Sequence, residues 1–369
     1  MRILFVCGGT AGHINPALAV ADYIKQHRTD TQILFAGNPG GMEASLVPAA
    51  GYAFAPIEVA GFQRRISAEN VGRNLRAGYL LARSSGKAKS IIKSFGPDLV
   101  MGTGGYVTGP VLRKAAQMGI KTVTHEQNAF PGVTTKLLAA QVDKVLLAFA
   151  EAGERLKCKN PPTVTGNPVR GQLLTADRAA ARQKLSVAPD KLCILSFGGS
   201  LGASPVNTAV AGLMLHHGGR YHHIHASGKV NHSDFMAIPG IAALMSNPHF
   251  DIRPYIDDMA DCLAAADLVI CRAGAITLSE LTAVGRASIL IPSPYVAENH
   301  QYHNAMSLVR ADAADILVEK DLSADALVQK TEAILGIPNR LAALCRNAAK
   351  MGIPDATDRI AAEIDRLMA

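Results

Sequence analysis

The sequence contains one local pattern twice: a short apolar run, a glycine loop and a helix-like segment. The first copy is residues 3–7 followed by GGTAGH at 8–13, and the second, about 190 residues later, is 192–197 followed by GGSLG at 198–202. A short, continuously apolar run that meets glycine is typical of a strand buried on both faces of a parallel sheet. Strand-like runs that alternate with helix-like segments follow each copy, which predicts two α/β domains with doubly wound parallel sheets.

The remaining strands and the domain boundary follow from the same pattern. In the first half, strand-like runs occur at residues 31–36, 98–101, 122–125, 144–148 and 163–165. In the second half they occur at 224–226, 250–252, 268–271 and 288–291. A chain of 369 residues exceeds what one core usually supports, and Asn167-Pro168 punctuates a strand end, so we predict domains at 1–166 and 167–354. In the first helix, Asn15 is expected at the N-cap and Pro16 at the first helical position.

Glycine loops between a buried strand and a helix are potential anion sites, because glycine admits a close ligand and the free N–H groups of the helix favour phosphate. GGTAGH lacks the GxGxxG spacing, no acid follows the second strand at Ala36-Gly37-Asn38, and there is no GK[ST]. Nicotinamide-dependent enzymes and P-loop ATPases are therefore disfavoured. A third glycine loop, at 102–107, follows another strand and favours a site over a simple turn.

Polar residues follow several of these strands. His13 ends the first loop and is expected to take a proton, face a phosphate, or merely cap or pack. Residues 125–128, HEQN, are typical of a sugar-binding or proton-transfer edge. Glu280 is suited to bind a ribose diol or simply to stabilise its helix, and Gln301 to bind sugar hydroxyls. Asp257-Asp258 fits a helix N-cap better than a metal site, because no other ligands cluster nearby.

The spacing of the cysteines and the lengths of the apolar runs indicate the compartment in which the protein is expected. The six cysteines include no CxxC pair, which disfavours a disulfide framework or a zinc site and favours a reducing compartment. The N-terminal apolar run is too short for a signal peptide. No stretch approaches the ~20 apolar residues of a transmembrane helix, so we expect a soluble or membrane-surface protein.

The net charge of +7 belongs to one segment, the basic patch at residues 62–95. Its basic residues are Arg64, Arg65, Arg73, Arg76, Arg83, Lys87, Lys89 and Lys93, against the single acid Glu69, and the rest of the chain is neutral. Interleaved apolar residues favour an anionic membrane surface as the partner, although packing on the domain itself must account for some of them. Nucleic acid is not expected, because no recognition motif accompanies the patch.

Nine motifs occur in the order in which one known family has them. They are GGTAGHINPALAVA (8–21), MEASLVP (42–48), GTGGYVTGP (102–110), HEQNAFPG (125–132), GNPVR (166–170), FGGSLGA (197–203), IDDMA (256–260), CRAGAITLSE (271–280) and IPDATDRIA (353–361). Over its whole length the chain therefore resembles the MurG family of bacterial N-acetylglucosaminyltransferases. One departure is Ala11, where the family usually has Gly. Because Ala disfavours positive φ, the first loop is expected to differ slightly in geometry.

The resemblance implies a GT-B glycosyltransferase fold, two Rossmann-like doubly wound domains with parallel sheets facing across a cleft, and a last helix at 355–369 that returns to the N-terminal domain. It implies inverting transfer of GlcNAc from UDP-GlcNAc to the C4 hydroxyl of undecaprenyl-pyrophosphoryl-MurNAc-pentapeptide (lipid I), which gives lipid II for peptidoglycan. It implies neither a cofactor nor a metal. The N-terminal domain is expected to bind the acceptor at the cytoplasmic face of the inner membrane, as a peripheral protein.

Site residues carry over from the matching motifs. The substrate-binding positions are Thr10, Ala11, Gly12, Asn128, Arg170, Ser200, Ile256, Ala275, Ile276, Thr277, Leu278, Ser279, Glu280 and Gln301, and the acceptor-side positions are Gly104, Gly105 and Tyr106. Among them, Ser200 and its loop are implied to bind the diphosphate, Glu280 the ribose, and the backbone of Ile256 the uracil. Gln301 and Asn128 are implied to hold the GlcNAc hydroxyls.

The transfer needs a base for the attacking hydroxyl and positive potential for the leaving diphosphate, which helix N-termini can supply. His13 is the first candidate for the base and Glu126 the second, and His13 could instead only position a diphosphate. Three other functions remain open on the motifs. They are a GT-B enzyme with another lipid acceptor such as diacylglycerol, a UDP-GlcNAc 2-epimerase, and a non-catalytic nucleotide-sugar sensor.

Overall fold

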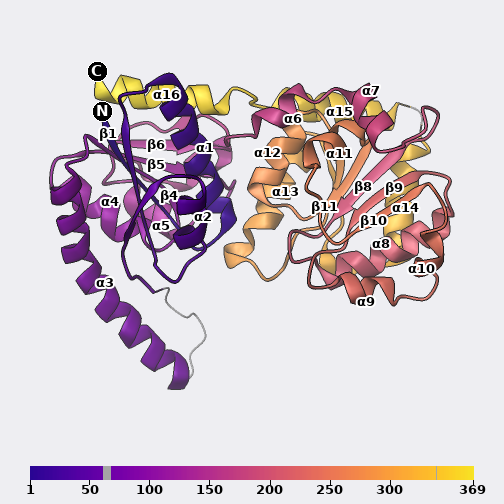
Figure 1. Ribbon diagram of the computed structural model, residues 1–369, viewed down its shortest axis with the longest axis horizontal. Coiled ribbons are helices and arrows are strands. Elements are labelled where there is room, and N and C mark those ends of the chain that lie inside the picture. The colour runs from indigo at the N-terminus through magenta and orange to yellow at the C-terminus, as the bar shows by residue number, and fades with distance from the viewer. Residues whose placement is uncertain (61–67, 338) are drawn as a thin grey trace. The chain divides into compact units, whose positions relative to one another are not determined.

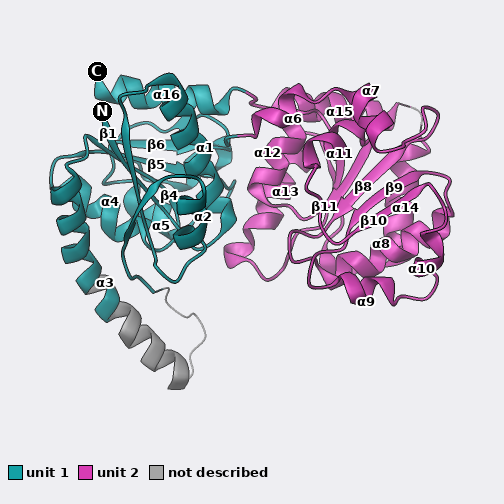
Figure 2. Cartoon of the chain, in the orientation of Figure 1, with its two compact units in different colours: residues 1–168, 355–369 teal, residues 169–354 magenta. Residues whose placement is uncertain are grey.

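The computed structural model describes residues 1–60, 68–337 and 339–369, with backbone alone for 68–78, 81 and 82. Arg64 and Arg65 of the basic patch lie outside the described residues, as do the side chains of Arg73 and Arg76. The chain forms two compact units (Figure 2): unit 1 is residues 1–168 with 355–369, and unit 2 is residues 169–354.

Unit 1 is built on a seven-stranded parallel sheet of order β3-β2-β1-β4-β5-β6-β7. Its strands are β1 (Arg2–Cys7), β2 (Gln32–Gly37), β3 (Ala53–Pro56), β4 (Leu99–Gly104), β5 (Lys121–Glu126), β6 (Lys144–Leu147) and β7 (Thr163–Val164). Its helices are α1 (Ala11–His27), α2 (Glu43–Ala49), α3 (Ala68–Phe95), α4 (Thr108–Gln117), α5 (Val133–Leu138), the 3₁₀ helix η1 (Ala150–Arg155) and α16 (Ala356–Met368). The order reverses between β1 and β4, where ligands bind in open α/β sheets.

The two faces of this sheet carry separate cores, because side chains alternate along each strand. From β1, Ile3 and Phe5 pack with Ile14 of α1 and with Ile360 of α16, which joins the far end of the chain to unit 1 (Figure 1). The intervening residues of β1 pack on the opposite face with α3 and α4, including the fully buried Ile92. Some of the apolar residues of the basic patch therefore belong to the core of unit 1.

Unit 2 repeats this plan with a six-stranded parallel sheet of order β10-β9-β8-β11-β12-β13. Its strands are β8 (Cys193–Phe197), β9 (His222–Ala226), β10 (Phe250–Arg253), β11 (Leu268–Cys271), β12 (Ala287–Leu290) and β13 (Asp315–Ile316). Its helices are α6 (Gly171–Thr175), α7 (Arg178–Lys184), α8 (Ser204–His217), α9 (His232–Met236), α10 (Ile241–Leu244), α11 (Met259–Ala265), α12 (Ala275–Ala283), α13 (His300–Arg310), α14 (Ala324–Leu335) and α15 (Arg340–Met351), with 3₁₀ helices η2 (Ala297–Asn299) and η3 (Glu319–Asp321).

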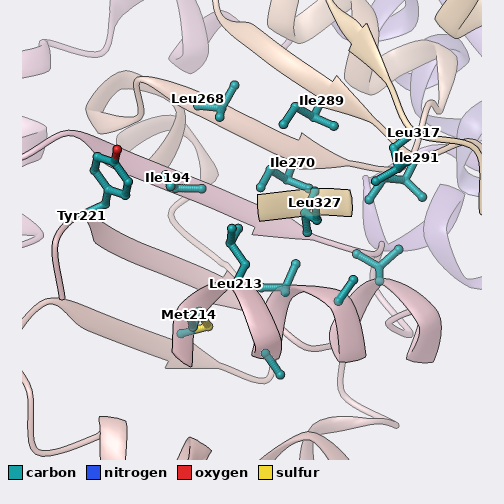
Figure 3. Packing of buried hydrophobic residues seen from close by; sticks show 14 of the residues in the cluster. Ile194, Leu213, Met214, Tyr221, Leu268, Ile270, Ile289, Ile291, Leu317 and Leu327 are labelled. Carbon is teal, nitrogen blue, oxygen red and sulfur yellow. The ribbon is translucent and has the colours of Figure 1, made fainter. Parts of the chain in front are cut away.

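The core of unit 2 shows why the second apolar run becomes a central strand. Ile194 of β8 and Ile270 of β11 point toward Leu213 of α8 and Leu327 of α14, and these side chains fill one face of the sheet (Figure 3). The pairing of Leu195 with Val269 places β8 directly beside β11. The strand order of unit 2 therefore reverses between β11 and β8, the strand that leads into the second glycine loop, as the order of unit 1 reverses between β4 and β1. Among the described residues, no helix is both long and apolar enough to cross a bilayer.

Candidate functional site

Two glycine loops of unit 1 meet where the strand order reverses. Gly8 follows β1, and Gly105 follows β4 with φ +87°. A Cβ at Gly105 would lie 2.4 Å from the carbonyl oxygen of Gly8, so any larger residue would push the loops apart. At Gly104, with φ +117°, a Cβ would lie 2.5 Å from Nδ1 of His13. Gly104 and Gly105, two of the predicted acceptor-side residues, thus permit the close packing of both loops around His13, while Tyr106 beside them is 61% exposed.

The first helix starts at Ala11, five residues before Pro16, which was predicted to be its first residue. Thr10 is at the N-cap with φ −140° and ψ 155°, Ala11 opens α1, and Pro16 lies inside the helix. The positive φ of the loop falls on Gly9, at +88°, and Ala11 is helical, so the loop does not need Gly at position 11. The early start places the first N–H groups of α1, which have no partner within the helix, directly at the loop.

A buried acid for which no role was predicted, Glu43, accepts a hydrogen bond from this loop. Glu43, at the start of α2, is 1% exposed. Its carboxylate accepts hydrogen bonds from the backbone N–H of Gly9 at 3.2 Å and of Asn38 at 2.9 Å. A Cβ at Gly8 would lie 2.4 Å from its Oε1. The sequence feature that indicates this contact is the GGMEASLVP segment at residues 40–48, in which two glycines precede an acid at the start of a helix.

His13 lies at the centre of the unit 1 site, at the end of a chain of contacts with HEQN. Its Nδ1 is 3.0 Å from Oε1 of Gln127, although the two residues are 114 positions apart. Nε2 of Gln127 is 2.9 Å from Nδ1 of His125, whose Nε2 is 2.9 Å from the carbonyl oxygen of Gly166. The hydroxyl of Thr103 donates to the backbone oxygen of His13 at 2.7 Å. The His13 side chain is itself partly exposed, so its other ring nitrogen can face a substrate.

Glu126, the second candidate for the base, is committed to the loop that follows β5. Its Oε1 accepts from the backbone and side-chain N–H groups of Asn128, both at 3.1 Å. Its Oε2 accepts from the backbone N–H of Gly132 at 2.9 Å and from the hydroxyl of Thr135 at 2.5 Å. With four donors on its two oxygens, this buried carboxylate is fully occupied by the loop, so the geometry favours a role in orienting Asn128.

The corresponding edge of unit 2 forms a cavity of about 540 Å³ at the N-terminus of α8. Its lining comes from the glycine loop with the start of α8 and from the segments that follow β9, β11 and β12: Phe197, Gly198, Gly199, Gly202, Ala203, Ser204, Pro205, Asn231, Arg272, Gly274, Thr277, Ser293, Tyr295 and Gln301. Oε1 of Gln301 accepts from the backbone N–H of Ser293 at 2.9 Å, which fixes the amide so that its nitrogen can donate to a ligand. Two predicted residues, Thr277 and Gln301, thus share one cavity.

Glu280 and Arg170 form a second part of the unit 2 site. Nε of Arg170 donates to Oε1 of Glu280 at 2.8 Å, and Glu280 is 7% exposed. Burial raises the pKa of Glu280, while the charge and hydrogen bond of Arg170 act in the opposite direction. A buried carboxylate beside a guanidinium can accept from a vicinal diol while remaining paired. Arg170 also lines an adjoining cavity of about 350 Å³ with Asp257 and Asp258 at the start of α11.

The other predicted unit 2 residues differ in how they could meet a ligand. Ile256, Ala275 and Leu278 are buried, with Leu278 entirely in the core, so their contacts would run through the backbone. Ile276, Thr277 and Ser279 are partly exposed on α12. Ser200 is exposed in the glycine loop but does not line the larger cavity.

Arg272 and Tyr295 line the larger cavity and were not predicted as site residues. Arg272 pairs with Glu319 and donates to the backbone oxygens of Ile291 and Pro292. Its place in the CRAGAITLSE motif was a signal, whereas nothing in the sequence marked Tyr295. Across the described ranges, no three His, Cys, Asp or Glu side chains lie close enough together to hold a metal ion.

Comparison with known proteins places the chain in a family. The glycosyltransferase family 28 N-terminal domain matches residues 3–147, and its C-terminal domain matches residues 193–360. The UDP-N-acetylglucosamine–N-acetylmuramyl-(pentapeptide) pyrophosphoryl-undecaprenol N-acetylglucosamine transferase of Acetivibrio thermocellus is 46% identical, over 98% of this chain and 96% of the relative. The protein of the same name from Caldanaerobacter subterraneus is 42% identical, over 98% of both chains.

Solved structures agree with this grouping. The crystal structure of Acinetobacter baumannii MurG has a TM-score of 0.79 and 28% identity, and the match covers 99% of each chain. A glycosyltransferase of Streptomyces sp. SF2575 has a TM-score of 0.63 at 16% identity, over 98% of this chain and 99% of that one, and shares the fold alone. The predicted GT-B fold is confirmed, and the chain belongs to glycosyltransferase family 28 and, within it, to the MurG family of N-acetylglucosaminyltransferases.

Proposed function

We propose that this protein transfers GlcNAc from UDP-GlcNAc to the C4 hydroxyl of MurNAc in undecaprenyl-pyrophosphoryl-MurNAc-pentapeptide, with inversion at C1. Full-length relatives are named for this transfer. The observation that carries the proposal is the unit 2 cavity, which combines a glycine loop, the N-terminus of α8 and the amide of Gln301. A helix N-terminus beside a polar amide is suited to a sugar diphosphate. The reaction is the step from lipid I to lipid II in peptidoglycan synthesis.

The donor is assigned to unit 2 residue by residue. The loop of Ser200 and the N–H groups at the start of α8 bind the diphosphate, and they stabilise the charge that develops as UDP leaves. Glu280 accepts from the ribose hydroxyls with Arg170 beside it, and the backbone of Ile256 meets the uracil. Gln301 donates to the GlcNAc hydroxyls.

The acceptor is assigned to unit 1. The start of α1, at Thr10, Ala11 and Gly12, faces a diphosphate, and the residues 104–106 border the sugar. Asn128, held by Glu126, contributes to GlcNAc binding. His13 acts as general base: it removes the proton from the C4 hydroxyl while that oxygen bonds to C1 and the C1–oxygen bond to UDP breaks.

An assay with three acceptors tests the proposal. The full chain is incubated with UDP-GlcNAc and a lipid-linked MurNAc-pentapeptide analogue, with diacylglycerol, or with no acceptor. We expect UDP and a β-linked disaccharide only in the first arm. Glycosylated diacylglycerol would instead identify a different lipid glycosyltransferase, and a free epimerised sugar without acceptor would identify a 2-epimerase. Either of these results, without disaccharide, would overturn the proposal.

We propose further that the protein is peripheral at the cytoplasmic face of the inner membrane and docks through the basic patch. The described part of the patch supports this: Arg83, Lys87, Lys89 and Lys93 are exposed on α3, whereas Ala88 and Ile92 between them are buried. The exposed ring of Tyr79 lies under the Arg83 guanidinium, 5.5 Å from ring centroid to carbon. A basic face with an aromatic side chain is suited to the headgroup region of anionic lipid.

Charge reversal on α3 tests this docking. We expect Arg83→Glu, Lys87→Glu and Lys89→Glu together to weaken binding to phosphatidylglycerol vesicles, because each base near such a surface contributes ~1 kcal/mol. Co-sedimentation at low and high salt measures it, and added salt should also weaken the wild type. The exposed residues Lys157, Lys320 and Lys350, changed to Glu together, match the loss of net charge away from α3. Equal loss of binding in both triple variants would refute a localised patch.

A further inference from the structure

The protonation of His13 can be deduced from the chain of contacts behind it, starting at its far end. The carbonyl oxygen of Gly166 can only accept, so the Nε2 of His125 that lies 2.9 Å from it carries a proton. His125 is buried, and this burial lowers its pKa, so the ring is neutral and holds one proton only. Its Nδ1 must therefore accept a hydrogen bond.

The side-chain amide of Gln127 contacts both histidines, so the position of the proton on His125 determines its position on His13. Nε2 of Gln127 faces Nδ1 of His125 at 2.9 Å and the backbone oxygen of His125 at 3.0 Å, and both are acceptors. Two acceptors on one side fix the amide with its nitrogen toward His125 and its oxygen toward His13. Because an amide oxygen only accepts, the His13 Nδ1 at 3.0 Å must carry the proton.

We infer that Gln127 and His125 are positioning residues that hold neutral His13 in the Nδ1–H tautomer, with its lone pair on Nε2. Thr103 fixes the backbone of His13 at the same time, and Gly104 leaves space for the ring. The tautomer follows from these contacts alone. Its use in removing the C4 hydroxyl proton rests on the proposed function, because only a ring nitrogen without a proton can act as the base.

Nitrogen NMR of the imidazole tests the tautomer without reference to activity. The full chain is labelled with ¹⁵N-histidine and measured well above pH 7, and the signals of His13 are identified by their loss in His13→Gln. We expect a protonated Nδ1 and an unprotonated Nε2, and Gln127→Met should abolish this preference. A wild-type His13 with its proton on Nε2 would overturn the inference.

Kinetics then connect the tautomer to catalysis. Gln127→Met should lower kcat roughly 10- to 100-fold, the loss that is typical when a residue that orients a metal-binding histidine is removed, and leave KM for UDP-GlcNAc unchanged. His125→Phe should have a smaller effect, because the backbone oxygen of His125 still holds the Gln127 amide. Thr124→Val, buried in the same strand, is the matched control and should keep wild-type kcat. Wild-type kcat in Gln127→Met would refute a positioning role.

The tautomer of His13 and its role as the base are tested separately. If His13 shows the Nδ1–H tautomer and His13→Ala still turns over normally, the role of Gln127 in holding the tautomer stands and the assignment of His13 as base is wrong. If the tautomer is reversed, the inference fails even where the enzyme makes the disaccharide.

Discussion

Replacing His13 with alanine is expected to reduce kcat by roughly 10²- to 10⁴-fold, the usual contribution of a general base. This corresponds to about 3–5 kcal/mol of lost transition-state stabilisation. KM for UDP-GlcNAc should change little, because His13 is assigned to the acceptor, and most residues assigned to the donor lie in unit 2, around Glu280 and Gln301. Steady-state release of UDP in the presence of a lipid I analogue measures both constants.

His27→Ala is the matched control for this variant. His27 ends the same helix, is exposed, and contacts only its neighbours on α1 among the described residues, through Nδ1 to the backbone oxygen of Tyr23 and through ring stacking on that tyrosine. Its replacement should leave kcat near the wild-type value. A large rise in the KM for lipid I with an unchanged kcat in His13→Ala would instead show that His13 only positions the acceptor diphosphate.

The central strands of both sheets could be predicted from the sequence, because strands buried on two faces are continuous apolar runs. The edge strands β7 and β10 were also predicted, at 163–165 and 250–252, but the edge strands β3 and β13 were not. Ala53–Pro56 of β3 is only partly buried, and β13 has two residues, so neither forms such a run. The predicted start of α1 was also wrong. Proline is common at the first helical position, so Pro16 was expected there, but the helix begins at Ala11, directly after the glycine loop. Pro16 is tolerated inside α1 since the carbonyl that it leaves unpaired belongs to Gly12, which is exposed.

The candidate site was predictable as motifs but not as contacts. The glycine loops mark where each strand order reverses, and a reader of the sequence can infer that these loops meet. The sequence does not indicate that Gln127 rather than Glu126 contacts His13, since both are polar residues of one loop. The GGMEASLVP segment marks Glu43 as an acid at a helix start, but it does not indicate that the Glu43 carboxylate accepts from Gly9 of the first loop. Both facts follow from tertiary packing between segments far apart in the chain.

Unit 2 contains a group of buried histidines that the substrate assignments do not use, and these predict instability in acid. His217, His222, His223 and His225 are all buried, on α8 and β9. Burial lowers the pKa of His217 and of His222 to about 4 and that of His225 to about 3, and it holds the pKa of His223 well below its usual value. Glu332 opposes this only at His217.

The sign of the effect follows from proton binding. Unfolded histidines have a pKa near 6.5, so below that pH the unfolded chain takes up protons that the folded unit excludes. The stability that these residues contribute is complete above pH ~6.5 and is lost as the pH falls toward 4. Each histidine lowers the free energy of unfolding by roughly 1.4 kcal/mol per pH unit within this window. Together the group is expected to unfold unit 2 well before pH 4, since domains are stable by only about 5–15 kcal/mol.

His222→Leu isolates one member of the group. Neither ring nitrogen of His222 has a hydrogen-bond partner among the described residues, so leucine removes a buried polar group at little cost near pH 8. Calorimetry of the full chain between pH 8 and pH 5 should show a weaker pH dependence of the unit 2 transition, less by roughly 1.4 kcal/mol per pH unit below 6.5. Ile224→Val, in the same strand, should shift stability at every pH without changing that slope. If His222→Leu keeps the wild-type slope, His222 is protonated in the folded state and the acid instability must come from other groups.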